Sequence, residues 1–486
     1  MLIFTSNIVK IINIYCKILA FAASHQSLFS YPKEISMKTT RRDFMKRSGA
    51  VAAGLTLATQ TLATQAIPRV HAAESNRIKV VTVGCGSRGS GATRQALAAD
   101  PNLVLWAVAD VFEEKAQKSV QLIKEDIEGD GQGEKIDVTP ERTFVGFDAY
   151  KKAMDTLSPG DVVLLTTPPA FRPLHFAYAV EKGLNVFAEK PLAVDIPGLK
   201  SLQESNKKAM EKGLKVAVGL NNRHYFRTEE TIQAIQDGKL GDVTSLWVYR
   251  MHPTHRLGPI RNMTPLEFQL KHIFNFNWTT GGFIVDALIH NLDVCCWAIG
   301  ELPVAAQGQG GRLIRTAKDQ MIDHAAVEYL FKDGRRMMMF AKTFDNTWDC
   351  FQSIIHGTKG SALVGEGVGE PRFFSDYNAS TTAKNSFWTA EAPANNSYQT
   401  EHDLFFKAIR ENQPWNELDR GIGATFTPIL GRMAMETGQF VTAEDAWNST
   451  FQYIPDIAGL SFDGPSPIVP DENGDYPQGI PGVTKV

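Results

Sequence analysis

Three residues in the second half of the chain have types and spacing that suit the oxidation of an alcohol. Asp286 and His290 stand four positions apart, and Asp293 follows three positions later. On a helix the three side chains share one face, which places a carboxylate beside the imidazole. A neutral imidazole can accept the proton of a hydroxyl while a hydride leaves the same carbon. The pattern predicts His290 as a general base and Asp286 as its orienting partner.

The hydride needs an acceptor, and the loop Gly84-Cys85-Gly86-Ser87-Arg88-Gly89 predicts a dinucleotide. It follows the β-branched run 78–83, as the first turn of a nucleotide-binding fold does. The first glycine permits a tight turn, the second lets the backbone approach a pyrophosphate, and the third lets a helix pack on the strand. Free N–H groups at the start of that helix then bind the pyrophosphate.

The residue at the end of the next apolar run indicates which dinucleotide binds. The run 103–109 leads to Asp110, where a carboxylate can accept both hydroxyls of the adenosine ribose and repel a 2′-phosphate. NAD is therefore predicted, and Lys115 is the nearby cation that keeps NADP as an alternative.

Strand and helix patterns alternate from residue 78 to about 218, which predicts an α/β Rossmann domain with a doubly wound parallel sheet over 77–218. A buried strand, 161–165, ends at Thr167-Pro168, a helix is expected over 173–182, and the strand 184–188 runs into Glu189-Lys190-Pro191. Ligands bind at the carboxyl ends of such strands, so Lys190 is expected to reach the nicotinamide. The predicted cofactor contacts are Gly84, Gly86, Ser87, Arg88, Gly89, Asp110, Thr167, Pro168, Glu189 and Lys190.

The pattern changes after residue 218. Longer alternating runs at 243–251, 325–331, 336–344 and 350–356 predict an α+β domain over 219–451 with a large, open, mostly antiparallel sheet. We expect loops over 357–396, helices over 401–410 and 421–438, and a tail over 452–486 that is too rich in Pro, Gly and Asp for regular structure. An open sheet needs its exposed face covered, so a homodimer or homotetramer is predicted.

The N-terminal region resembles a twin-arginine export signal. Arg41 and Arg42 precede a mildly apolar stretch, 48–67, and Ala72 offers a cleavage site. Residues 37–72 are therefore predicted to engage the twin-arginine machinery and to be removed, giving a periplasmic or secreted protein. Retention of the uncleaved signal as a membrane anchor is the less favoured alternative, because the apolar stretch is only weakly hydrophobic. Residues 1–36 are interpreted as an over-extended start. Little free nicotinamide is available outside the cytoplasmic membrane, so a tightly bound cofactor is expected.

The amino-acid composition argues against several classes of partner and site. The chain has 486 residues, 43% of them hydrophobic, with a formal net charge of −3, and this near-neutral balance argues against nucleic acid as a partner. Five cysteines without a Cys-x-x-Cys motif, and no His-Glu-x-x-His motif, give little support to a disulfide framework or a metal site.

Together these motifs resemble the Gfo/Idh/MocA family of oxidoreductases. The resemblance rests on the glycine loop, Asp110, Thr167-Pro168, Glu189-Lys190-Pro191, and Gly281-Gly282 followed by Asp286, His290 and Asp293, and it extends over about 77–451. It implies that Lys190 orients a sugar hydroxyl and tunes its proton transfer, with Asp286 and His290 as the other catalytic residues. It also matches Arg223 to an arginine between the domains, which either binds substrate or staples the domains together.

Further contacts to a sugar are expected from the second domain, namely from His252, His255, Arg256 and Trp278, through hydrogen bonds and ring stacking. The predicted function is an exported NAD(P)-dependent oxidoreductase acting on a hydroxyl of a sugar, polyol or glycoside. The alternative is a glycoside hydrolase that oxidises its substrate transiently, eliminates the aglycone and returns the hydride. A third interpretation is a non-catalytic sugar-binding protein with the same fold.

Overall fold

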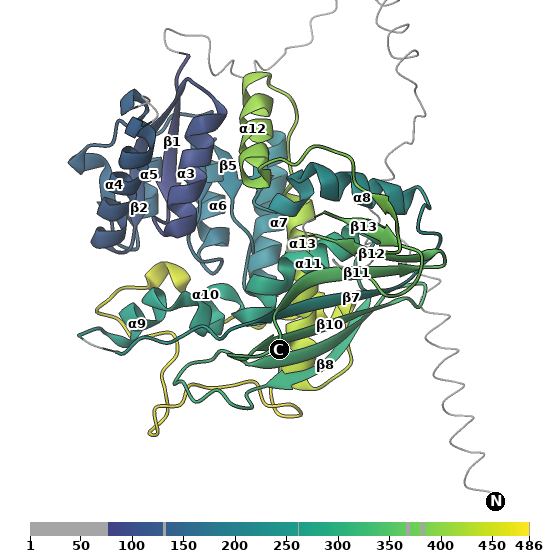
Figure 1. Cartoon of the computed structure of the whole chain (residues 1–486). Coiled ribbons are helices and arrows are strands. Elements are labelled where there is room, and N and C mark those ends of the chain that lie inside the picture. The colour runs from purple at the N-terminus through teal and green to yellow at the C-terminus, as the bar shows by residue number, and fades with distance from the viewer. Residues whose placement is uncertain (1–75, 130–132, 261, 366–369, 381–383, 486) are drawn as a thin grey trace, which may run out of the picture. The chain divides into compact units, whose positions relative to one another are not determined.

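The structure is a computed structural model that describes residues 76–129, 133–260, 262–365, 370–380 and 384–485 (Figure 1). The predicted signal at 37–72 and the predicted extension at 1–36 lie outside the described residues. Two sheets organise the rest of the chain.

The first sheet has six parallel strands in the order β3-β2-β1-β4-β5-β6. The strands are β1 (Ile78–Val83), β2 (Leu103–Asp110), β3 (Thr143–Val145), β4 (Val162–Leu165), β5 (Asn185–Ala188) and β6 (Val216–Val218). This is the order of a dinucleotide-binding doubly wound fold. The predicted fold class is confirmed, and the carboxyl ends of β1, β2, β4 and β5 meet at one edge.

Helices cover both faces of this sheet because its strands are apolar on both sides. The helices are α3 (Ser87–Ala99), α4 (Glu113–Gly129), α5 (Ala149–Met154), α6 (Arg172–Glu181) and α7 (Ile196–Glu211). Val81 packs in the cluster that holds Tyr150, whereas its neighbour Val80 packs with Phe405. Phe405 belongs to α12 (Ser397–Arg410), which returns from late in the chain to lie beside α3 (Figure 1).

The second sheet has nine strands in the order β14-β13-β12-β11-β7-β10-β9-β8-β15. Among the described pairings only β7 with β10 is parallel. The strands are β7 (Val243–His252), β8 (Ala305–Gly311), β9 (His324–Leu330), β10 (Arg336–Thr343), β11 (Cys350–Gly357), β12 (Gly360–Val364), β13 (Arg372–Phe374), β14 (Ser386–Thr389) and β15 (Val441–Thr442). The prediction of an open, mostly antiparallel sheet is confirmed.

One face of this sheet packs against two apolar helices, α11 (Gly282–Ile299) and α13 (Leu418–Thr437). The remaining helices are α8 (Phe226–Gln236), α9 (Pro265–Lys271), α10 (Asn277–Thr280) and α14 (Ala443–Trp447). The stretch Asn277–Ile299 is long and apolar enough to cross a membrane, but 78% of it is buried inside the protein, as expected of a core helix.

The prediction of loops over 357–396 is wrong, because this stretch contains β12, β13 and β14. These strands are only three to five residues long, and β12 carries Gly and Ser at its start. Their order comes from pairing outward from β11, which local sequence does not reveal.

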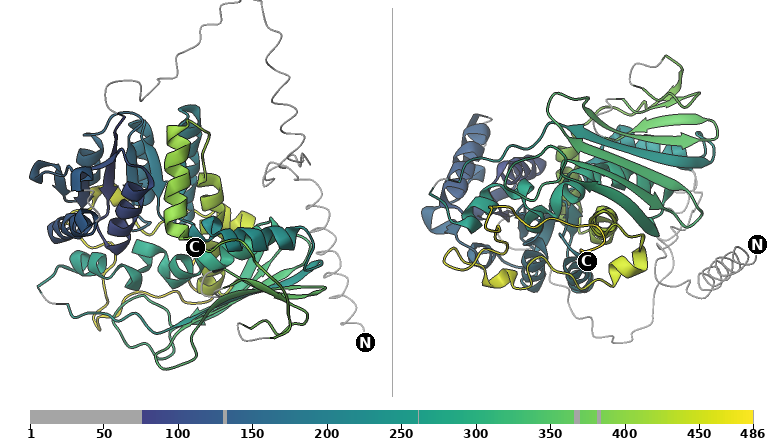
Figure 2. Two further views of the ribbon diagram at one scale, coloured as in Figure 1. Left: turned by 45° about the horizontal axis from the view of Figure 1, so that its top comes forward. Right: turned by 90° about the horizontal axis from the view of Figure 1, so that it is seen from below.

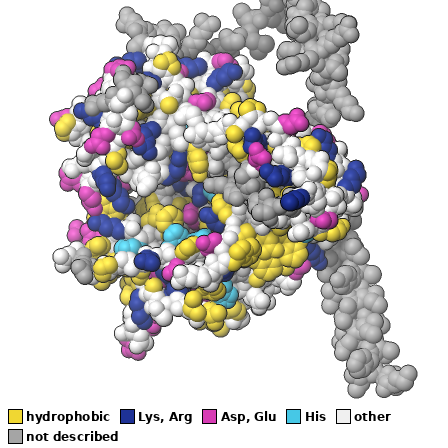
Figure 3. Space-filling view, viewed as in Figure 1, with side chains coloured by type: hydrophobic (Ala, Val, Ile, Leu, Met, Phe, Trp, Pro, Cys, Tyr) yellow, Lys and Arg dark blue, Asp and Glu magenta, His cyan; other side chains and the backbone are white. Residues whose placement is uncertain are grey.

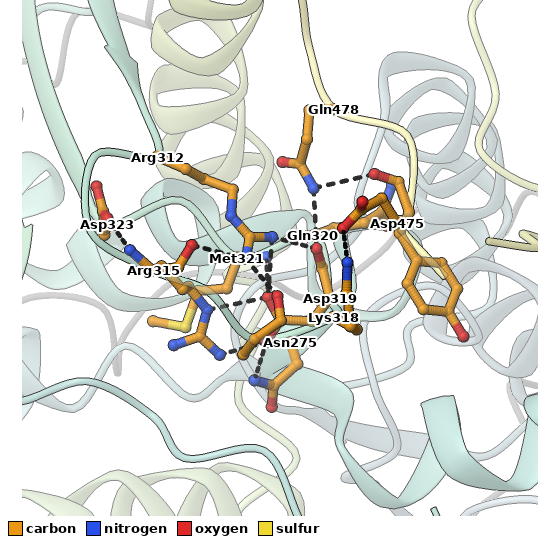
Figure 4. A network of polar contacts seen from close by, with 12 residues as sticks. Asn275, Arg312, Arg315, Lys318, Asp319, Gln320, Met321, Asp323, Asp475 and Gln478 are labelled. Atoms are coloured by element: carbon orange, nitrogen blue, oxygen red, sulfur yellow. Dashed lines mark hydrogen bonds and ion pairs between the residues drawn. The ribbon is translucent and has the colours of Figure 1, made fainter. Parts of the chain in front are cut away.

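The tail has one short 3-10 turn, Ile457–Gly459, but its side chains pack firmly. Tyr476 is buried in a cluster with Phe276 and Trp278, and Figure 2 shows the yellow tail crossing the molecule beside the second domain. A polar network centred on the buried Asp319 fixes its end (Figure 4). Gln478 donates to the Asp319 carbonyl at 2.9 Å and Lys318 pairs with Asp475 at 2.7 Å.

Candidate functional site

The glycine loop has the geometry that a pyrophosphate needs. Gly84 has φ +100°, and a Cβ there would lie 2.5 Å from the backbone nitrogen of Thr167. A Cβ on Gly89 would lie 1.9 Å from the Gly84 carbonyl, whereas a Cβ on Gly86 would meet no atom within 4 Å. Gly84 and Gly89 therefore permit close packing, and Gly86 keeps open the space beside the start of α3. The loop fits a dinucleotide phosphate.

Asp110 closes this loop from the end of β2. Its Oδ2 accepts a hydrogen bond from the Cys85 backbone at 2.7 Å, and its Oδ1 accepts one from the Phe112 backbone at 2.9 Å. Burial raises the pKa of Asp110, and these two hydrogen bonds oppose that shift. Each carboxylate oxygen has a further lone pair for a ribose hydroxyl.

A cavity of about 120 Å³ opens at this edge of the sheet, and Figure 3 shows a hollow there with a hydrophobic floor and histidines along its lower side. Its lining includes Gly84, Gly86, Asp110, Lys115, Thr167 and Pro168. Ser87, Arg88, Gly89, Glu189 and Lys190 are not part of this lining. The adenosine side of the predicted cofactor contacts thus comes together in one cavity.

Arg88 and Glu189, both predicted as cofactor contacts, pair with each other instead. Arg88 Nε lies 2.5 Å from Glu189 Oε1, and its guanidinium lies over the ring of Tyr398 at 4.8 Å. Glu189 is buried, and a Cβ on Gly219 would lie 2.7 Å from its carboxylate. The pair therefore links the glycine loop to the end of β5, directly before Lys190.

Lys190 reaches across from the Rossmann domain to α11. Its Nζ donates to the backbone carbonyl of Asp286 at 2.8 Å and lies 3.5 Å from Asp286 Oδ1. Both side chains keep about a fifth of their surface exposed, at 19% and 21%. The structure therefore brings together the lysine and the aspartate that the sequence placed 96 positions apart.

Two glycines set where α11 begins. Gly281 and Gly282 have φ +81° and +83°, and a Cβ on them would lie 2.8 Å from Val285 and 2.7 Å from Asn277 Oδ1. No other residue suits both positions. The helix that follows carries Asp286 and His290 one turn apart.

His290 lies beside this lysine–aspartate pair as a neutral imidazole. Burial, together with the charges of Lys190 and Arg250, lowers the pKa of His290 well below its usual range. Its Nδ1 is buried and has no hydrogen-bond partner among the described residues. Asp286 pairs with Lys190 and not with His290, so the expected direct orientation of the imidazole by Asp286 is not observed.

Asp293 and Arg223 form a buried ion pair away from this group. Arg223 Nε and Nη2 each donate to Asp293 at 2.8 Å, and the guanidinium lies over Trp297 at 4.8 Å. Arg223 belongs to the 3-10 turn Asn221–His224 between the domains. Of its two predicted roles, the geometry favours the staple over the substrate contact, and Asp293 does not add a carboxylate to the site.

The predicted sugar contacts of the second domain separate into two groups. Trp278 is fully buried and donates from Nε1 to Gln269 at 2.8 Å, so the expectation that its ring stacks on a sugar is wrong. The expectation came from the residue type, because tryptophan often stacks on sugars. In this protein the Trp278 ring fills the core beneath α9. His255 and Arg256 are exposed, and the ring of His255 lies 5.3 Å from that of His252.

Arg250 is a site residue that the sequence analysis missed. It lies on β7 on the same face as the buried Val248, and its guanidinium lies 3.6 Å from the centroid of the Phe351 ring. Its positive charge contributes to lowering the pKa of His290. The available signal was its position in the alternating strand, which assigns an arginine to the inward face of the sheet.

Comparison with known protein families shows to which family this chain belongs. Residues 78–220 match the model described as the oxidoreductase family, NAD-binding Rossmann fold, and residues 229–363 match the GFO/IDH/MocA C-terminal domain. The two matches follow one another and together cover more than half of the chain. The protein belongs to the Gfo/Idh/MocA family. Its first domain is therefore an NAD-binding Rossmann domain.

Curated relatives in this family include inositol dehydrogenases. The chain is 26% identical over 209 residues to scyllo-inositol 2-dehydrogenase (NAD(+)) of Bacillus subtilis, which covers 42% of this chain and 55% of that protein. It is 32% identical over 130 residues to inositol 2-dehydrogenase of Gluconacetobacter diazotrophicus, which covers 26% and 32%. The chain thus aligns with about half or less of these two relatives.

Solved structures show the same fold over most of the chain. The aldose-aldose oxidoreductase of Caulobacter crescentus, complexed with glycerol, superposes with a TM-score of 0.58 at 16% identity, covering 75% of this chain and 99% of that one. A levoglucosan dehydrogenase in complex with NADH and levoglucosan superposes with a TM-score of 0.56 at 18% identity, covering 76% and 99%.

Proposed function

We propose that this Gfo/Idh/MocA protein is an NAD-dependent oxidoreductase that transfers hydride between the nicotinamide and a hydroxyl-bearing carbon of a sugar or polyol. The observation that carries the proposal is the meeting of Lys190 with Asp286, one helical turn from a neutral imidazole. The lysine follows a strand of the dinucleotide domain, and the imidazole belongs to the other domain.

Each of the three residues has a separate task in the reaction. The bound nicotinamide supplies the hydride acceptor. The Lys190 ammonium holds the substrate oxygen and stabilises negative charge on it as its proton leaves. His290, held neutral by its surroundings, accepts that proton. Asp286 holds the Lys190 ammonium in place through its backbone carbonyl and carboxylate.

The substrate class is proposed from the names of the relatives and from the polar side chains of the second domain. The names of the relatives refer to inositols, aldoses and levoglucosan, which are compact compounds with several hydroxyls. His255 and Arg250 provide polar groups that suit such hydroxyls. A sugar or polyol is therefore our first choice.

The test is NADH formation by purified protein, loaded with NAD, over a panel of inositols, aldoses and anhydrosugars. Substrate-dependent NADH formation that is lost in Lys190→Met supports the proposal. If a glycoside releases its aglycone while no NADH accumulates, the hydrolase alternative takes its place. If the sugars bind but neither product forms, the protein is a non-catalytic sugar-binding member of the fold.

We further propose that the protein is exported and that it assembles as a homodimer or homotetramer. Arg41 and Arg42 support export by the twin-arginine route and release into the periplasm or medium. For assembly, the support is an apolar face of the large sheet, seen as a broad hydrophobic patch in Figure 3. There Phe340 stacks between Trp247 and Tyr249, with ring centroids 5.9 Å apart in both pairs, and Trp348 is 61% exposed.

Two measurements test these proposals. The N-terminal sequence and location of the mature protein show whether cleavage falls near Ala72. Light scattering on a size-exclusion column gives the molar mass, which Trp348→Glu is expected to lower by breaking the assembly.

A further inference from the structure

The second domain forms part of the wall at the adenosine end of the cofactor cavity. Leu270 and Ile273, from α9 and the short turn Ile273–Asn275, line the cavity together with Asp110 and Phe112. Asp110 is the residue expected at the adenosine ribose. A dinucleotide in this cavity therefore has Leu270 of α9 against its adenosine half, so α9 borders the path by which that half would leave.

A charged and aromatic contact fastens α9 to the Rossmann domain. Lys271 Nζ lies 3.0 Å from Glu114 Oε1 on α4, and it also lies over the ring of Phe112 at 4.8 Å. The same ammonium thus contacts a carboxylate and the aromatic wall of the cavity. The pKa of Glu114 is lowered, first by its hydrogen bond with Lys271.

The tail holds α9 from the other side. Phe462 packs its ring 5.7 Å from Phe112 and 5.0 Å from Phe147, centroid to centroid, and both of these rings line the cavity. Gln269 of α9 donates to the Ile468 carbonyl at 2.9 Å. The tail therefore contacts both the wall of the cavity and the helix that covers it, and Figure 1 shows its yellow trace beside α9 and α10.

Both ends of this tail segment are anchored. At its start, the Tyr453 backbone donates to Asp195 Oδ2 at 3.3 Å. At its end, Gln320 donates to the Pro477 carbonyl at 2.9 Å, within the network of Figure 4, which also holds Asp475 and Gln478. A segment fixed at 453 and at 475–478 holds Phe462 in place at low cost in entropy.

We infer that residues 452–478 form a strap that keeps α9 closed over the adenosine half of the dinucleotide, so that the cofactor stays bound through many turnovers. The inference rests on the proposed function, because it assigns a fate to the cofactor of that site. It identifies Phe462 and the Lys271–Glu114 pair as cofactor-retaining residues that do not take part in hydride transfer.

The experiment measures NADH dissociation from the full-length mature protein. Preloaded NADH is chased with excess NAD, and the loss of its bound-state fluorescence is followed in a stopped-flow instrument. The variants are Phe462→Ala, Lys271→Met and the double variant. Their matched controls are Phe387→Ala, a half-exposed phenylalanine of β14, and Lys207→Met, which breaks an exposed ion pair with Glu204 on α7.

The strap predicts that each variant speeds NADH release at least about fivefold, and the double variant about twenty-fivefold, or roughly 2 kcal/mol. The controls release NADH at the wild-type rate. Hydride transfer to preloaded NAD in a single turnover is expected to be unchanged in every variant. Release rates that equal the wild type in correctly folded variants would refute the strap but leave the oxidoreductase intact. If the wild-type protein binds no NADH, the proposed function itself fails.

Discussion

Replacing His290 with asparagine is expected to remove proton transfer and to leave cofactor binding intact. A general base contributes roughly 10²–10⁴ in rate. Burial and two cations weaken His290 as a base, which places its contribution at the lower end, about a hundredfold to a thousandfold or ~3–4 kcal/mol in the activation barrier. Asparagine keeps much of the volume, and His290 does not line the adenosine cavity, so the affinity for NADH should not change.

The assay is steady-state NADH formation at several pH values, with NADH affinity measured by fluorescence titration. The proposed reaction needs the neutral imidazole, and the pKa of His290 is lowered, so kcat/KM of the wild type should fall only as pH drops well below the usual histidine value of about 6.5. This acid limb should be absent from His290→Asn. His356→Asn, on the outer face of the sheet, is the matched control. Wild-type turnover in His290→Asn would refute the assignment.

Three further substitutions test the surroundings of the site. Arg250→Gln removes a charge that lowers the pKa of His290, so the acid limb of kcat/KM should move to higher pH; an unchanged profile contradicts this. Asp293→Asn leaves Arg223 buried without its carboxylate and should lower the free energy of unfolding by about 3–5 kcal/mol in urea titrations. Burial lowers the pKa of His175 to about 3, so between pH ~6.5 and about 3 the histidine is protonated in the unfolded chain but not in the folded one. The free energy of unfolding should therefore fall by ~1.4 kcal/mol per pH unit as pH drops through this range. His175→Gln should make this slope shallower in urea titrations at several pH values.

The Rossmann half was readable from the sequence because its signals are local. A β-branched run, a glycine loop and Asp110 at the end of the next run occur within 33 residues, and β1 and β2 begin and end where the pattern predicts. The strands β12 to β14 gave no such signal, because strands of only three to five residues owe their order to successive pairing, β12 with β11, β13 with β12 and β14 with β13.

The site was predictable in its residue types and less so in its contacts. Helical spacing places Asp286 and His290 on neighbouring turns, but it says nothing about which neighbour competes for the carboxylate. Lys190 takes it, because the strand end that carries this lysine faces the same turn of α11. For Trp278 the residue type itself misled, because it suggested a sugar contact whereas the side chain is fully buried in the core.

A residue outside the proposed site connects the segments that carry its two halves. Arg432, buried in α13, donates from Nη1 to the Val194 carbonyl and to the Gly281 carbonyl, both at 2.9 Å. Val194 lies four residues after Lys190, and Gly281 directly precedes α11. One guanidinium thus ties the segment after the lysine to the start of the helix that carries His290, the proposed base. A buried cation needs hydrogen-bond partners, and here its two hydrogen bonds to carbonyls connect the segments that carry Lys190 and His290, whose relative position the proposed reaction requires.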